Sequence, residues 1–179
     1  MTIRRYKSFT PKLGNKVFVD PTALVLGNVV IGEDSSIWPM AVLRGDVHAI
    51  RIGKRTSIQD GTVCHVTHDG PFDPGGFSLN VGDNVTIGHK AILHGCTIES
   101  NCLIGMGAVV MDGAIIKEHV IIGANSLVPP GRELQGGYLW VGSPARKIRK
   151  LTDEELGFFE YSANNYVNIK NEHLEDSDL

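Results

Sequence analysis

A six-residue period runs through most of this chain of 179 residues and constrains its fold more than any other feature. An aliphatic residue recurs at every sixth position and is often followed by glycine, as in Ile31-Gly32, Ile87-Gly88 and Ile122-Gly123. Neither an α-helix nor a simple strand sustains such a period over most of a chain. A solenoid does, because each hexapeptide forms one short strand and a turn, and the aliphatic side chains stack inward.

The period is interrupted three times. Three residues are added after Leu43, eleven are added after Cys64, and one is missing after Leu93. The long insertion includes residues 69–76, whose glycines and prolines predict a loop outside the solenoid. Sixteen of the seventeen leading positions are Val, Ile or Leu, and the other is Cys64. These positions are 19, 25, 31, 37, 43, 52, 58, 64, 81, 87, 93, 98, 104, 110, 116, 122 and 128.

This pattern resembles the hexapeptide-repeat family, in which three hexapeptides form one coil of 18 residues in a triangular prism. The resemblance implies an all-β solenoid, a left-handed parallel β-helix, although crossover connections are generally right-handed. Thr152-Asp153-Glu154-Glu155 is typical of a capping box and predicts a C-terminal α-helix. The expected segments are a lead-in over 1–16, the β-helix over 17–134 with a loop insertion at about 69–80, a connector over 135–151, the helix over 152–171 and an acidic tail over 172–179.

Charge and composition exclude several classes of function. The formal net charge is −3, which does not favour nucleic acid or an anionic membrane as a partner. No stretch approaches the ~20 apolar residues of a membrane span. The three cysteines form no CxxC pair, which indicates reduced thiols and predicts a cytoplasmic protein.

Two of the seven histidines fall into one stack once the insertion is subtracted. His65 follows Cys64 and His94 follows Leu93, so both take the second place of a hexapeptide. They are 29 residues apart, and 29 − 11 leaves 18, one full coil. We therefore expect the two side chains on the same face of adjacent coils, roughly 5 Å apart, close enough to share a metal ion.

A third histidine lies on another face. Arg44 joins the stack, because it precedes His65 by 21 residues, of which three are added. His89 takes the third place of its hexapeptide, with Asp60 one coil below it and Gln59 beside Asp60. A single chain cannot easily bring His89 to an ion held by the stacked pair, whereas a threefold assembly can. A homotrimer is thus expected if all three histidines are ligands.

These residues resemble the pattern of the γ-class carbonic anhydrases, and most closely the bacterial YrdA-type branch. The resemblance covers roughly residues 10–150 and includes Arg44-Gly45-Asp46, Gln59-Asp60, His65 and the run from His89 to His94. It implies a trimer in which two metal ligands come from one subunit and the third from the next. The implied ligands are His65, His89 and His94, the metal is zinc, with Fe, Co or Ni as alternatives, and a fourth position remains for water.

The implied activity is reversible hydration of CO2 to bicarbonate by metal-bound hydroxide at the subunit boundary. Gln59 would orient water or substrate, and Arg44 and Asp46 would pair and brace the boundary. Asp60 would support the inter-subunit ligand. Tyr161 would reach the site from the C-terminal helix.

The chain departs from the family pattern in its glutamates. Val47 stands where a Glu near the metal is expected, and the insertion after Cys64 has Asp69 and Asp73 but no Glu. Fast hydration needs a route for the proton. The alternatives are a slow or inactive site, another shuttle such as His68, or a different reaction.

Two other classes of function remain open. Many hexapeptide-repeat proteins are acyltransferases that use a single histidine base, but that role leaves three converging histidines unexplained. A non-catalytic trimer stapled by metal, or a thioesterase-like relative, is the other alternative. Chelation would dissociate a stapled trimer, whereas an enzyme could lose activity and stay assembled.

Overall fold

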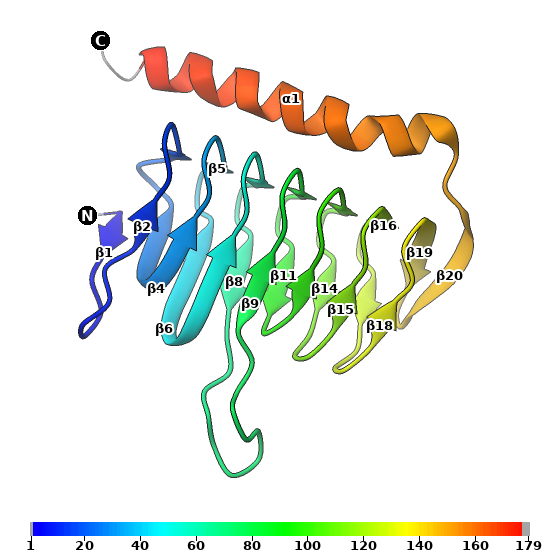
Figure 1. Ribbon diagram of the computed structural model, residues 1–179, viewed down its shortest axis with the longest axis horizontal. Helices are drawn as coiled ribbons and strands as arrows, with labels where there is room; N and C mark the ends of the chain where they lie inside the picture. Colours follow the sequence, from blue (N-terminus) through cyan, green and yellow to red (C-terminus); the bar gives the residue numbers. More distant parts are fainter. Residues whose placement is uncertain (1, 177–179) are drawn as a thin grey trace.

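The computed structural model describes residues 2–176 and shows a prism of stacked coils with one long helix along it (Figure 1). The coils form a left-handed parallel β-helix, which confirms the solenoid expected from the six-residue period. Within the described residues, no helix has the length and apolar character that a membrane span requires.

Two sheets, parallel except for the last strand, make the three faces of the prism. The larger sheet has twelve strands and folds around one corner, and the smaller has eight. The larger comprises β1 (Ile3–Arg4), β2 (Lys12–Leu13), β4 (Leu24–Ile31), β6 (Val42–Ile52), β8 (Val63–His65), β9 (Leu79–Val81), β11 (Ile92–His94), β12 (Thr97–Ile98), β14 (Val109–Val110), β15 (Ile115–Ile116), β17 (Leu127–Val128) and β18 (Glu133–Leu134). The smaller comprises β3 (Phe18–Val19), β5 (Ser36–Ile37), β7 (Ser57–Ile58), β10 (Thr86–Ile87), β13 (Leu103–Ile104), β16 (Val120–Ile122), β19 (Tyr138–Gly142) and β20 (Ala145–Lys150).

The core is a stack of the leading hexapeptide residues. Sixteen of the seventeen are buried, and Val19 is half-buried. Each fully buried aliphatic side chain contributes roughly 1.5–3 kcal/mol of transfer free energy. The repeat thus supplies one continuous core along the prism, which fixes the register of every coil and with it the positions of the site residues.

One corner of the prism carries the turns that follow β5, β7, β10, β13 and β16. We call it the His89 corner; its turns are Pro39–Met40, Asp60–Gly61, His89–Lys90, Met106–Gly107 and Ala124–Asn125. The second residue of each turn has a positive φ, from 56° at Asn125 to 68° at Gly107. Glycine takes this conformation without steric cost. The rigid turns hold the first residues, His89 among them, in a column along the corner.

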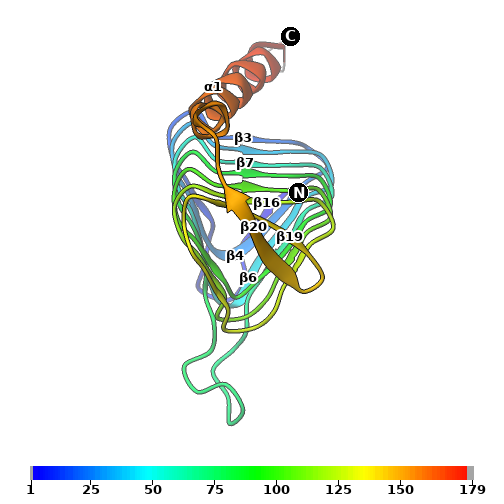
Figure 2. The ribbon, with the colours of Figure 1, turned by 90° about the vertical axis from the view of Figure 1, so that its right-hand side faces the viewer.

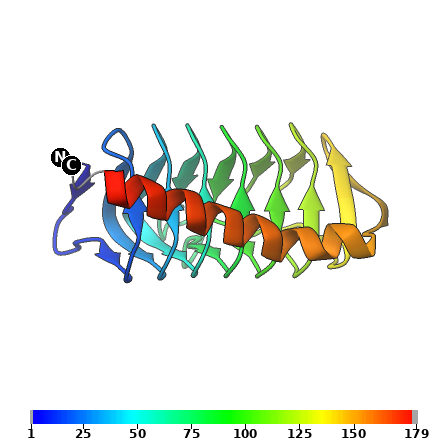
Figure 3. The ribbon, with the colours of Figure 1, turned by 90° about the horizontal axis from the view of Figure 1, so that it is seen from above.

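A single helix, α1 (Asp153–Asp176), lies along the smaller sheet and crosses successive coils (Figure 3). Its start shows the predicted capping box, in which Glu155 N donates to Thr152 Oγ1 and Thr152 N donates to Glu155 Oε2. The helix continues five residues beyond the expected end at 171, through most of the acidic segment, and residues 177–179 lie outside the described part. The buried side chains Phe159 and Ala163 face the coils.

Two segments depart from the regular coils. Residues 66–78, the protruding loop, leave the corner between β8 and β9, away from the face that α1 covers (Figure 2). The segment expected to be a connector over 135–151 contains β19, which pairs with β16 as one more coil, and β20, which returns antiparallel to β19.

Candidate metal centre

His65 and His94 lie side by side on the outer surface of the larger sheet. β8 and β11 pair in parallel with His65 opposite His94, as the 18-residue subtraction predicts. Nδ1 of His65 is 3.1 Å from Nε2 of His94, and the ring centroids are 5.0 Å apart. Two nitrogens bound to one tetrahedral zinc are about 3.3 Å apart. The spacing of the pair therefore suits a shared ion.

The far nitrogen of each ring is held by a carboxylate. Nε2 of His65 is 3.1 Å from Asp46 Oδ1, and Nδ1 of His94 is 2.8 Å from Asp112 Oδ1. An ionised carboxylate only accepts hydrogen bonds, so the ring N–H of each neutral histidine sits on its far nitrogen. The two near nitrogens then present lone pairs to each other, an unfavourable contact that a cation between them relieves. This chemistry fits a metal ion.

Asp46 has a second partner that keeps it ionised. Arg44 Nη1 donates to Asp46 Oδ2 over 2.6 Å. Burial is the largest single influence and would raise the pKa of Asp46, but the hydrogen bonds from Arg44 and His65 together with the Arg44 charge lower it overall. The pKa of His65 is also lowered, chiefly because burial disfavours its charged form. Both shifts favour a neutral imidazole beside a carboxylate, the form that binds metals.

Asp112 was not among the predicted site residues. It follows His94 by 18 residues, but the residue missing after Leu93 shortens this coil to 17. Because β11 pairs Leu93 with Val110, the repeat phase points to Met111 and misses Asp112 by one residue. Thr67 Oγ1 also donates to Asp112 Oδ1, over 3.0 Å. Gly95 makes the approach possible, because a Cβ at this position would collide with the Asp112 carboxylate and with Phe77.

We expect Asp112→Asn to lower the affinity for zinc about 10–100-fold, the usual cost of losing a carboxylate that orients a metal-binding histidine. Competition with a chromogenic chelator measures this affinity. Glu99→Gln is the matched control, because Glu99 pairs with Lys117 rather than with a histidine. Equal affinities in Asp112→Asn and the unmodified protein would show that Asp112 does not orient His94.

His89 lies on its corner with the same kind of partner. Its Nδ1 is 2.9 Å from Asp60 Oδ2, and the two side chains are 47% and 49% exposed. The structure thus places Asp60 beside His89, and one ring nitrogen of His89 is left for another partner. Within residues 2–176, no three His, Cys, Asp or Glu side chains of one chain are grouped so that they could hold a metal ion.

An aliphatic stripe covers the face between the His89 corner and the paired histidines. The residue before each inward core position on this face points outward, and six of these are aliphatic. They are Leu24, Val42, Val63, Ile92, Val109 and Leu127, joined in register from strand to strand. Val63 and Ile92, beside the histidines, are 39% and 42% exposed. Such a contiguous apolar strip on an outer sheet surface marks an interaction site.

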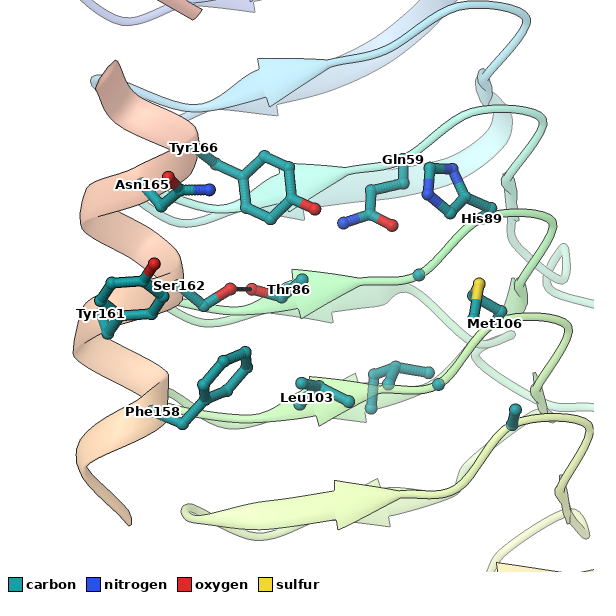
Figure 4. Close-up of a pocket in the computed structure, with 14 residues that line it drawn as sticks. Gln59, Thr86, His89, Leu103, Met106, Phe158, Tyr161, Ser162, Asn165 and Tyr166 are labelled. Carbon is teal, nitrogen blue, oxygen red and sulfur yellow. Dashed lines mark hydrogen bonds between the residues drawn. The ribbon is translucent and has the colours of Figure 1, made fainter. Parts of the chain in front are cut away.

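A groove runs between the His89 corner and α1, with a volume of about 380 Å³ (Figure 4). We call it the α1 groove. Gln59 and His89 lie at one end, and the exposed Tyr161 lies along the helix side. In Figure 4 the amide nitrogen of the buried Gln59 faces the hydroxyl of Tyr166, and its amide oxygen lies on the side of His89.

Tyr166 is a second residue that sequence analysis did not assign to the site. Burial, followed by the negative charge of Asp60, raises the pKa of its hydroxyl, while a hydrogen bond with Gln59 acts in the opposite direction. A neutral Tyr166 therefore holds the orientation of the Gln59 amide. No sequence signal identifies it, because the repeat does not specify which coil a helical residue will meet.

Val47, His68 and the cysteine two residues after His94 lie near the site or in the core. Val47 lines a shallow cavity with Asp46 and His48 on the strand that carries Arg44. His68 is in the protruding loop, at a small cavity beside Phe72. Cys96 is fully buried, and burial raises the pKa of its thiol, which makes it a packed core residue.

Comparison with known proteins agrees with these features. The family described as bacterial transferase hexapeptide (six repeats) matches residues 10–45, 79–110 and 95–130. The chain is 48% identical over 173 residues to protein YrdA of Escherichia coli (strain K12), covering 97% of this chain and 94% of that protein. It is 43% identical over 171 residues to mitochondrial γ carbonic anhydrase 2 of Arabidopsis thaliana, covering 94% of this chain and 60% of that protein. The chain belongs to the γ-carbonic-anhydrase-like hexapeptide-repeat family, which includes protein YrdA.

A solved structure of the same family supports the fold. The hexapeptide transferase family protein of Anaplasma phagocytophilum matches with a TM-score of 0.84 and 39% identity, covering 93% of this chain and 95% of that one. Solved acyltransferases such as AntD of Bacillus cereus are only 18% identical, a likeness that shows the shared solenoid alone.

Proposed function

We propose that this protein is a γ-carbonic-anhydrase-like enzyme that interconverts CO2 and bicarbonate at a metal site shared by two subunits of a homotrimer. His65 and His94 of one subunit and the partner subunit's His89 would hold the metal. One observation carries the proposal: each of these three histidines has one ring nitrogen on a carboxylate and the other available to a metal.

The face of the prism that carries the aliphatic stripe supports a metal site shared between subunits. The aliphatic stripe has the His89 corner at one edge and the His65–His94 pair at the other. A threefold axis facing the stripe buries the apolar strips of three subunits against one another. Each subunit then sets its own His65 and His94 against the neighbouring His89 corner, which repeats the same contact three times and closes the ring.

The remaining residues have roles that follow from their contacts. A bound zinc lowers the pKa of water toward 7 and so supplies a nucleophile for CO2 at neutral pH. Gln59, held by Tyr166, presents its amide oxygen beside His89, where it can accept a hydrogen bond from water or substrate. The Arg44–Asp46 pair keeps Asp46 ionised and the His65 ring fixed. Iron, cobalt or nickel would suit the same imidazoles.

Removal of the proton released during hydration is expected to limit the rate. Val47 has no proton to transfer, and residues 66–78 contain no Glu. His68 lies in the protruding loop, three residues after the proposed ligand His65, and its imidazole can titrate near neutral pH. It is our candidate proton shuttle. Turnover well below that of a fast carbonic anhydrase is therefore expected, rising with the concentration of an imidazole buffer that carries protons instead.

Stopped-flow CO2 hydration by the purified trimer, with metal content measured on the same sample, tests this function. We expect hydration above the buffer rate that is lost on chelation and restored by zinc. A trimer with one metal per subunit and no hydration above buffer would refute the enzymatic role, and dissociation of the trimer on chelation would favour a structural staple.

A further inference from the structure

The side chain of Phe72 is unusual on this surface, because it is 94% exposed. It stands near the tip of the protruding loop, which is internally braced. Thr67 and Phe77 bond to each other through both backbone pairs, at 3.0 and 2.9 Å, and Asp69 Oδ1 accepts from Gly75 N over 2.7 Å. The loop thus exposes the phenyl ring of Phe72 to solvent, although burying this side chain would stabilise the protein by roughly 1.5–3 kcal/mol.

The α1 groove presents an apolar surface that could bind an aromatic side chain such as Phe72. Beyond Gln59 and His89, its floor and rims are formed by Leu103, Met106 and Phe158. Met106 and Phe158 are 57% and 42% exposed, so the groove is open within one chain. A cavity of roughly 150 Å³ accommodates a benzene ring, and the groove volume is about 380 Å³.

The loop and the groove begin at the two sides of the proposed metal site. The loop starts at the residue after His65, and the groove starts at His89. In the proposed trimer these histidines meet across the subunit boundary, so the loop leaves its own prism beside the partner's groove. Six extended residues reach about 20 Å, which is enough for a loop of this length to lie over a neighbouring sheet.

The base of the loop also contacts coils that follow the coil of His65, which is the direction in which the groove extends. Phe77 at its base lies against Gly113, and Asp73 shares a shallow cavity with Asp112 and Pro130. All three of these neighbours belong to coils that follow the coil of His65. The apolar part of the groove likewise extends from His89 toward later coils, at Leu103 and Met106.

We propose that the protruding loop of each subunit docks in the α1 groove of the partner subunit, with Phe72 seated against Leu103, Met106 and Phe158. The occupant is a second copy of this chain. The docked loop would cover the proposed metal site and exclude bulk water from it. The inference rests on the proposed trimer and its shared histidines.

Photo-crosslinking tests the docking directly. Benzoylphenylalanine replaces Phe72 in the full chain, and isotopically labelled and unlabelled proteins are mixed before assembly. After irradiation, we expect adducts of mixed isotopic composition that join the loop to peptides containing Leu103–Met106 or Phe158–Tyr161. Benzoylphenylalanine at Ile148, an exposed apolar residue on β20, should give none.

Phe72→Ala gives a second readout without the probe. We expect at least about a tenfold weaker trimer association by sedimentation, as for a central apolar anchor of an interface, and no change in Ile148→Ala. A metal-loaded trimer with only intra-subunit adducts, or with none, would overturn the docking and leave the groove to a substrate, while the proposed function stands. A monomeric protein with unchanged coils would overturn both.

Discussion

Replacing either His89 or His94 by alanine is expected to remove bound zinc from every site of the protein. In the proposed trimer each site needs both residues, one from each side of the boundary, so each homogeneous variant would lack a ligand at every site. Loss of a ligand should exceed the 10–100-fold cost of losing its hydrogen-bond partner, so we expect at least about a hundredfold weaker binding. Hydration should fall to the buffer rate.

The coils should survive both substitutions. The side chains of His89 and His94 are 47% and 34% exposed and lie outside the core stack. Zinc content by atomic absorption and circular dichroism on the same samples separate loss of metal from loss of fold. His119→Asn is the control, because His119 contacts Phe159 and does not line the α1 groove, and asparagine tolerates its positive φ of 58°. Normal zinc content in His89→Ala would exclude His89 as a ligand.

Asp34→Asn is expected to destabilise the protein by about 3 kcal/mol, because it removes the carboxylate that pairs with a buried lysine of α1. Lys170 is completely buried, and its Nζ donates to Asp34 Oδ1 over 2.8 Å and to Asn171 Oδ1 over 2.6 Å. The substitution leaves a buried ammonium group without its carboxylate. The turn itself should be unchanged, since Asn accepts the φ of 57° at this position.

Denaturant unfolding followed by circular dichroism measures the free-energy change. Glu33→Gln is the matched control: its carboxylate is 46% exposed and 3.8 Å from Lys54, so its loss should cost less than about 1 kcal/mol. Equal stabilities of the two variants would show that the Lys170 pair does not anchor the helix.

Counting in units of the coil predicts much of the site. Each coil has the same length once the insertions and the one missing residue are allowed for, so the subtraction that relates His65 to His94 is a statement about register, and the strands pair these residues as expected. The same counting relates Asp60 to His89, and Nδ1 of His89 is 2.9 Å from Asp60 Oδ2. It does not reach Asp112 from His94, because one residue is missing after Leu93 and the position one coil after His94 is Met111.

Features outside the repeat were not predictable in this way. The capping box predicts the helix but not which face of the prism it covers, so the contact of Tyr166 with Gln59 could not be foreseen. The pair of β19 and β20 was expected to be a connector, because its residues no longer follow the six-residue period. The helix extends to Asp176 through a polar segment that carries little pattern.

The most direct test of a site shared between subunits is a mixing experiment. Trimers of His89→Ala and His94→Ala are dissociated, mixed in equal amounts and reassembled, and zinc content and CO2 hydration are measured. A mixed trimer can unite the intact His65–His94 pair of one variant with the intact His89 of the other, so random assembly should restore about one quarter of the sites. Mixed trimers that regain neither zinc nor hydration, although unmodified subunits recover both after the same treatment, would contradict a site built across the subunit boundary.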